Sequence, residues 1–161
     1  MTETTDDRTD VRVEITVEVP RAEAFRVFTE EFDAIKPREH NLLAVDIAET
    51  VLEPRAGGDV YDRGVDGSIC RWGQVLAYEP PSRLVLAWLI GPHWQLEQDP
   101  AQASEVEIRF VEEGPSSTRV ELVHGHLDRH GDGWEGMVPA LDGDQGWPLY
   151  LQRYVELLSA R

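Results

Sequence analysis

Cysteine, lysine and long apolar runs are scarce in this chain of 161 residues. Cys70 is the only cysteine, so no disulfide can form within the chain, and we expect a protein of the reducing cytoplasm. Lys36 is the only lysine, and all other basic residues are arginines. No apolar run is long enough to span a membrane, and the acidic start "MTETTDDRTD" is unlike a secretion signal. These absences predict a cytoplasmic protein with no membrane partner.

Basic residues as a class are also few. The chain has 31 acidic and 15 basic residues, which gives a formal charge of −16. Binding to a phosphate backbone depends on clustered Lys and Arg that displace counterions, so no nucleic-acid partner is expected. An anionic membrane surface is disfavoured for the same reason. The excess of acid indicates a solvated, self-repelling surface.

The length fits one domain, which begins after a polar segment. We expect residues 1–10 to be a disordered tail and residues 11–161 to form a single domain. In "VRVEITVEV", residues 11–19, apolar and polar side chains alternate, which predicts a half-buried antiparallel strand. "RAEAFRVFTEEFDAI", residues 21–35, places three phenylalanines and Ile35 at helical spacing and predicts an amphipathic helix.

Beyond this helix the hydrophobic period becomes strand-like. Turn signals such as Asp66-Gly67 and Gly114-Pro115 separate six further predicted strands. Their ranges are 44–53, 59–64, 68–79, 84–90, 104–113 and 117–126. The last segment, 144–159, returns to helical spacing. We therefore predict an α+β fold, with a curved antiparallel sheet of about seven strands wrapped on a long C-terminal helix.

A long helix laid across a strongly curved sheet does not fill the concave face completely. The residual space predicts a site for a small apolar or aromatic molecule. In "GWPLYLQRY", Gly146 permits a close approach to a neighbouring segment and Pro148 suits a first helical turn. Trp147, held between them, should be buried at one end of the cavity, although plain core packing is the alternative.

Three motifs, in this order along the chain, resemble a known superfamily. They are "VEVPRAEAFRVFTEEFD", "GGDVYD…WGQVLAYEPPSRLVLAW" and "GWPLYLQRYVELL". The chain resembles the START-like (SRPBCC) helix-grip superfamily, in the branch named after the activator of the ninety-kilodalton heat-shock protein ATPase. The resemblance covers roughly residues 11–158 and implies the helix-grip fold. The segment "AIKPREHNLL" departs from it, because many relatives have Trp after the first helix.

Two histidines near the end of the last predicted strand are the polar candidates. In "TRVELVHGH", strand alternation places His124 and His126 on the inward face with Leu122, and His124 falls where relatives often have His. Two such rings can bind Zn²⁺, but no supporting Cys or Glu motif accompanies them, so we expect a polar wall and no metal. The predicted cavity residues are Phe28, Trp72, Trp88, His124, His126, Trp147, Leu151 and Tyr154.

Other motifs with possible chemistry are better explained by structure. Cys70 has no activating neighbours in the sequence and is expected to be a small core residue. Arg71 either faces the cavity, where it would bind a carboxylate or enolate, or pairs with surface acids. Asp59, Asp62 and Asp66 lack the spacing and terminal Glu of a calcium loop. No cofactor is therefore expected.

Three functions remain open at this level. The leading hypothesis is a binding protein that holds a small apolar or aromatic molecule without catalysis. The first alternative is a cyclase, dehydratase or hydrolase in which His124 acts as general acid or base. The second is a module that interacts with a chaperone. An apolar outer face on Val85, Ala87 and Leu89 is covered by a loop or by a second subunit, so a homodimer is possible.

Overall fold

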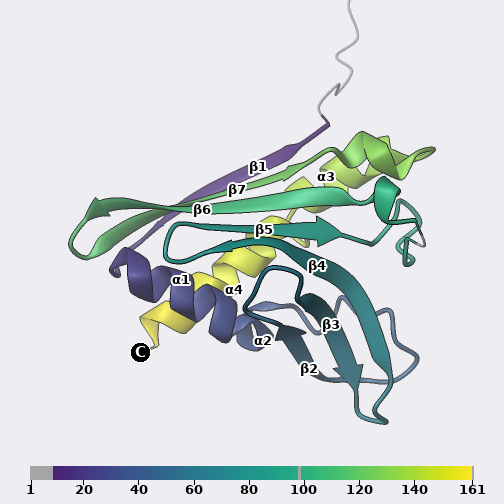
Figure 1. Ribbon diagram of the computed structural model, residues 1–161, viewed down its shortest axis with the longest axis horizontal. Helices are drawn as coiled ribbons and strands as arrows, with labels where there is room; N and C mark the ends of the chain where they lie inside the picture. Colours follow the sequence, from purple (N-terminus) through teal and green to yellow (C-terminus); the bar gives the residue numbers. More distant parts are fainter. Residues whose placement is uncertain (1–8, 98, 161) are drawn as a thin grey trace, which may run out of the picture.

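The computed structural model describes residues 9–97 and 99–160, so most of the predicted disordered tail, residues 1–8, lies outside the described residues. Seven antiparallel strands form one sheet in the order β1-β7-β6-β5-β4-β3-β2 (Figure 1). The strands are β1 (Val11–Val17), β2 (Ile47–Leu52), β3 (Asp59–Gly64), β4 (Ile69–Glu79), β5 (Arg83–Trp88), β6 (Ser104–Gly114) and β7 (Ser117–Gly125). The predicted antiparallel sheet of seven strands is thus confirmed.

The long C-terminal helix runs across one face of the sheet (Figure 1). The helices are α1 (Arg21–Glu30), α2 (Phe32–Ile35), α3 (Met137–Asp142) and α4 (Trp147–Ser159), and the 3₁₀ turns are η1 (Pro100–Gln102), η2 (Leu127–His130) and η3 (Trp134–Gly136). α4, at the end of the chain, contacts both α2 and β1, which lie near its beginning. Its inward face, with Trp147, Tyr150, Leu151 and Tyr154, is buried in the main core. The sheet with this long terminal helix is the predicted α+β helix-grip fold.

The helix boundaries differ from the sequence expectation in two places. The predicted helix 21–35 is interrupted at Glu31, whose φ of −116° and ψ of 27° leave the helical region. The predicted helix 144–159 begins only at Trp147, after the short helix α3 that the sequence did not indicate. A Cβ on Gly146 would lie 2.1 Å from the carbonyl oxygen of Leu141. This close approach to α3 requires glycine and sets the start of α4.

The outer face of β5 is covered by the chain itself. Ala87 and Leu89 form a small cluster with Ala103, which follows η1 directly. Val85 on the same strand is also buried. The segment that leads into β6 therefore shields part of the apolar outer face. Among the described residues, no helix is long and apolar enough to cross a membrane.

Candidate functional site

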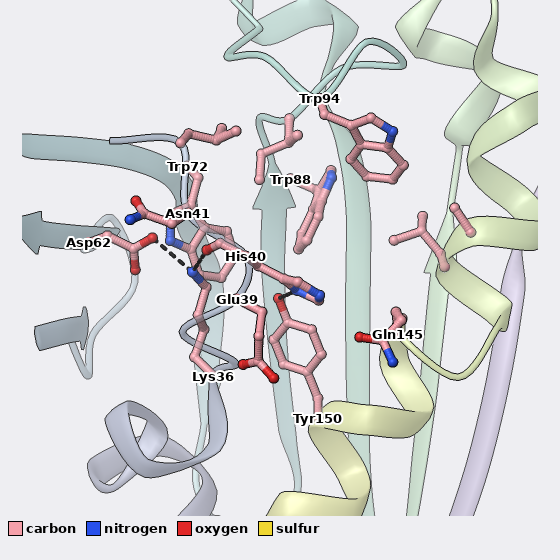
Figure 2. Close-up of a pocket in the computed structure, with 15 residues that line it drawn as sticks. Lys36, Glu39, His40, Asn41, Asp62, Trp72, Trp88, Trp94, Gln145 and Tyr150 are labelled. Carbon is pink, nitrogen blue, oxygen red and sulfur yellow. Dashed lines mark hydrogen bonds and ion pairs between the residues drawn. The ribbon is translucent and has the colours of Figure 1, made fainter. Parts of the chain in front are cut away.

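A cavity of ≈ 340 Å³ opens between the sheet and the helix layer (Figure 2). Its floor comes from β3, β4 and β5, and its sides come from the segment after α2, the loop after β5 and the junction of α3 with α4. The lining residues are Lys36, Glu39, His40, Asn41, Leu42, Asp62, Trp72, Trp88, Ile90, Trp94, Ala140, Leu141, Gln145, Gly146 and Tyr150. Such a cavity can hold a small organic molecule.

Aromatic rings form most of the apolar wall. Trp72 on β4 and Trp88 on β5 meet edge to face, with ring centroids 5.3 Å apart. They come together because β4 and β5 are antiparallel neighbours, with Gly73 directly opposite Trp88. Tyr150 enters from the second turn of α4, and Trp94 from the loop after β5 (Figure 2). Trp94 is 45% exposed, so its ring belongs to the mouth of the cavity.

One end of the cavity carries a buried ion pair. The Nζ atom of Lys36 lies 2.9 Å from Oδ2 of Asp62, and the two side chains are 4% and 2% exposed. Thr50 donates its hydroxyl to the other carboxylate oxygen of Asp62 at 2.6 Å. Lys36 also donates to the backbone carbonyl of His40. Burial lowers the pKa of Lys36, although Asp62 opposes this effect by attraction.

Next to this pair, a histidine and a tyrosine share a weak hydrogen bond. Nδ1 of His40 lies 3.4 Å from the hydroxyl of Tyr150. Burial and then the charge of Lys36 lower the pKa of His40, so its ring is neutral at neutral pH. Burial raises the pKa of Tyr150, which keeps its hydroxyl protonated. The cavity therefore contains a neutral imidazole beside a neutral phenol, and these groups can accept or donate protons.

Two buried donors in the wall have no acceptor among the described residues. The indole N–H groups of Trp72 and Trp88 are shielded from solvent and make no hydrogen bond within residues 9–97 and 99–160. A buried donor left unpaired costs about 1–3 kcal/mol, so such groups are uncommon in native proteins. Both belong to side chains that line the cavity.

His124 belongs to a different and fully paired network. Trp147 donates its indole N–H to Nδ1 of His124 at 3.0 Å, so the neutral ring carries its proton on Nε2. That proton is donated to Ser104 Oγ at 2.7 Å, and Ser104 donates in turn to Nε2 of His130 at 2.8 Å. His130 then donates from Nδ1 to Oε2 of Glu97 at 3.3 Å. We call these five residues the histidine network.

Burial keeps the two histidines of the histidine network neutral at neutral pH. His124 is fully buried, and burial together with the neighbouring His130 lowers its pKa to about 3. Burial also lowers the pKa of His130, while Glu97 partly offsets this effect. Both ring nitrogens of His124 are occupied by hydrogen bonds. The described residues contain no group of three or more His, Cys, Asp or Glu that could hold a metal ion.

Of the eight predicted cavity residues, the structure places Trp72 and Trp88 in the wall of the cavity. Trp147 is buried directly behind that wall, with its ring centroid 5.4 Å from that of Trp88 and 4.6 Å from that of Tyr150. His124 lies in the histidine network beside Trp147. Trp147 and His124 do not themselves line the cavity.

The remaining four predicted residues lie elsewhere. Phe28 and Leu151 are core residues, and Tyr154 donates its hydroxyl to the carbonyl of Ala24 at 2.6 Å deep in the core. His126 does not share the inward face of His124, and that expectation is wrong. β7 ends at Gly125, and His126 adopts a left-handed φ of 60° that turns its side chain into solvent.

Sequence reasoning missed the polar end of the cavity. Lys36 and His40 lie in "AIKPREHNLL", the segment that departs from the resemblance, and Lys36 is the only lysine of the chain. Those two facts together could have drawn attention to the segment. In the sequence Asp62 belongs only to the rejected calcium pattern, and nothing marks Tyr150 beyond its place in "GWPLYLQRY". Arg71 pairs with Asp59 at the surface, at 2.6 Å, and Cys70 is buried in the core, as expected.

This arrangement of a curved sheet, a terminal helix and a cavity between them defines a helix-grip domain. A family model described as "Activator of Hsp90 ATPase homolog 1-like protein" matches residues 18–159. The chain belongs to this family. No curated protein matches the chain.

Solved structures extend the comparison. The anthrahydroquino-gamma-pyrone synthase Txn09, complexed with a compound designated SUM, is 39% identical, with 92% of this chain and 96% of that chain covered and a TM-score of 0.64. The self-sacrificing resistance protein CalC from Micromonospora echinospora is 28% identical, with 94% of each chain covered and a TM-score of 0.65. Protein NE0264 from Nitrosomonas europaea, 18% identical over 98% of this chain and 99% of that chain at a TM-score of 0.66, shares the fold.

Proposed function

We propose that the protein binds a planar aromatic small molecule in the cavity beneath Trp94. The observation that supports this most directly is the aromatic wall itself, in which Trp72, Trp88 and Tyr150 surround an unfilled space of ≈ 340 Å³. Core side chains normally interdigitate without voids larger than a water molecule, so a space of this size is not required by folding. Aromatic rings offer large, rigid contact areas to another ring system.

The relatives support the same class of ligand. One relative is named as a synthase of an anthrahydroquinone-fused gamma-pyrone, a polycyclic aromatic product, and is 39% identical to this chain. Planar fused-ring molecules of this kind match the size of ordinary ligand pockets. We therefore expect a ligand built on two or more fused rings.

Equilibrium dialysis against anthraquinone-2-carboxamide, a neutral tricyclic probe, tests the proposal. We expect saturable binding with one site per chain. Ile90→Trp should fill the cavity and abolish binding, because Ile90 lines it. Ile69→Trp is the matched control, since Ile69 is exposed and lies outside the cavity, and it should bind as the unsubstituted protein does. Equal binding by both variants would place the probe elsewhere and contradict the proposal.

Ring closure of a polyketide-type substrate is a second candidate function. It is favoured by the Txn09 relative, together with the presence of Lys36, His40 and Tyr150 in the cavity. For this reaction His40 is the candidate general base. His124 is not, because both of its ring nitrogens already make hydrogen bonds within the protein. Chromatography of anthrahydroquinone precursors incubated with the protein would reveal a pyrone product. His40→Gln should abolish its formation while retaining probe binding.

A further inference from the structure

We propose that the ligand carries an ionised oxygen, as a phenolate, enolate or carboxylate, and that Lys36 binds this oxygen at the closed end of the cavity. The inference rests on the proposed function and adds the polar group of the ligand to it. It is drawn from the contacts of Lys36, from the charge of its surroundings and from the donors in the cavity wall.

The ammonium of Lys36 has capacity for another partner. An ammonium has three N–H donors, and the structure accounts for two of them, one to Asp62 and one to the carbonyl of His40. No third acceptor for Lys36 is present among the described residues, where its other neighbour is the face of Trp72, 5.8 Å from Nζ to the ring centroid. Figure 2 shows the ammonium between the Asp62 carboxylate on one side and Trp88 and Tyr150 on the other.

Each oxygen of the Asp62 carboxylate already has a donor. One of its oxygens accepts from Lys36 and the other accepts from Thr50 on the neighbouring strand. Asp62 therefore holds the lysine in place, and its negative charge favours the ammonium form against the effect of burial. A ligand oxygen in the cavity lies within reach of this cation, because Lys36 lines the space.

A buried ion pair also calls for an explanation beyond stability. Replacing such a pair with neutral or apolar side chains of similar volume is often neutral or stabilising, so folding alone does not account for it. The chain carries a formal charge of −16, and its surface repels anions. A protein of this charge binds an anionic group only where a cation is held at short range, and Lys36 is the cation that lines the cavity.

The rest of the inner wall offers donors. The indole N–H groups of Trp72 and Trp88 lack acceptors within the described residues, and the Tyr150 hydroxyl makes only the 3.4 Å contact with His40. The side-chain oxygen of Asn41 is already used by the backbone N–H of Leu43. The ammonium of Lys36 and the hydroxyl of Tyr150, both in the lining, suit a ligand with oxygen acceptors, such as a hydroxylated quinone or a polyketide.

Two probes that differ in one group test the inference. Anthraquinone-2-carboxylate and anthraquinone-2-carboxamide share their ring system and shape, and only the first is ionised at neutral pH. We expect the carboxylate to bind about ten- to a hundredfold more tightly, since hydrogen bonds to charged groups are the stronger kind. Affinities of both probes should be measured by calorimetry at low salt, where screening is weak.

The variant Lys36→Met/Asp62→Asn removes both charges together, because Lys36→Met alone would leave a buried carboxylate unpaired and could unfold the protein. We expect this variant to bind the carboxylate about tenfold or more weakly and the carboxamide unchanged. The matched control is Arg71→Met/Asp59→Asn, which makes the same type of change in an exposed pair on β3 and β4. This control should leave both affinities unaltered, and circular dichroism should show that both variants are folded.

The outcomes separate this inference from the proposed function. If both probes bind the unsubstituted protein equally, or if the double variant loses both to the same degree, the role of Lys36 in recognising an anion is wrong while the aromatic site stands. If neither probe binds the unsubstituted protein, the proposed function fails and this inference fails with it. The inference is supported if Lys36→Met/Asp62→Asn, and not the control variant, loses affinity for the carboxylate probe and keeps its affinity for the carboxamide probe.

Discussion

The cavity and the histidine network are built from the same types of residue on the same face of the sheet, yet they differ in one respect. In the histidine network every polar atom of His124 has a protein partner, and the rings around it leave no space. In the cavity, Lys36, Trp72 and Trp88 keep donors that no described residue accepts. Trp88 touches both regions, with its ring 5.1 Å from that of His124.

This comparison separates structural polar groups from those available to a ligand. Residue type does not distinguish them, because both regions contain a histidine beside aromatic rings. The discriminating features are whether the donors are satisfied and whether an unfilled volume adjoins them. On this basis the histidine network holds β6, β7, η2 and α4 together, and the cavity is the place where we propose that a ligand binds.

Trp147→Ala should break the histidine network with the largest effect on stability. The ring is buried, so its removal should lower the free energy of unfolding by about 3–5 kcal/mol. Trp94→Ala is the matched comparison on the cavity side, and because Trp94 is partly exposed, its loss should change stability by under about 1 kcal/mol while weakening probe binding. Thermal unfolding and dialysis of both variants check this. The reverse pattern would exchange the roles assigned to the two tryptophans.

Ser104→Ala should have the next largest effect. The hydroxyl joins His124 to His130, and its loss leaves two buried nitrogens without partners, at a cost of about 1–3 kcal/mol. Ser82→Ala, at an exposed turn, is a control and should be nearly neutral. Urea unfolding of both variants measures the difference. A neutral Ser104→Ala would show that the network contributes little to stability.

Acidification should destabilise the protein through the same network. The pKa of His124 is lowered to about 3 in the folded state against 6.5 for a free histidine, so between these values the unfolded chain binds more protons. Stability therefore falls as pH falls below about 6.5, by roughly 1 kcal/mol for this histidine near pH 5.5. His124→Gln should flatten the profile of unfolding free energy against pH. His93→Gln, which changes an exposed histidine outside the network, is the control variant.

Tyr150→Phe should produce the smallest change in stability. The hydroxyl makes one long contact with His40, so the free energy of unfolding should fall by less than about 1 kcal/mol. The ring that lines the cavity is retained, so the neutral probe should still bind, weakened by no more than the loss of one hydrogen bond. Calorimetric titration with that probe, after a thermal melt, checks both points. A large loss of stability would mean that Tyr150 belongs with the structural residues.

Much of the fold was evident from local pattern. The alternation in residues 11–19, the turn at Asp66-Gly67 and the helical spacing around Trp147 predicted strand, hairpin and terminal helix, and the sheet has the expected seven strands. These features follow from short-range geometry, because a strand repeats every two residues and a helix every 3.6. The same reasoning failed at His126, where the strand had already ended and a left-handed residue turned the side chain outward.

The cavity was decided by tertiary structure. Lys36 and Asp62 are 26 residues apart in the sequence, and His40 and Tyr150 are 110 apart, so no local pattern places them together. Whether a side chain binds a ligand depends on burial, on partners already engaged and on the volume left between elements. The sequence determined which faces of the strands and of the last helix are apolar, because the spacing of apolar residues along the chain sets those faces. Only the assembled fold decided which inward polar groups are satisfied, because hydrogen bonds and ion pairs act over a few ångströms in space and not along the chain.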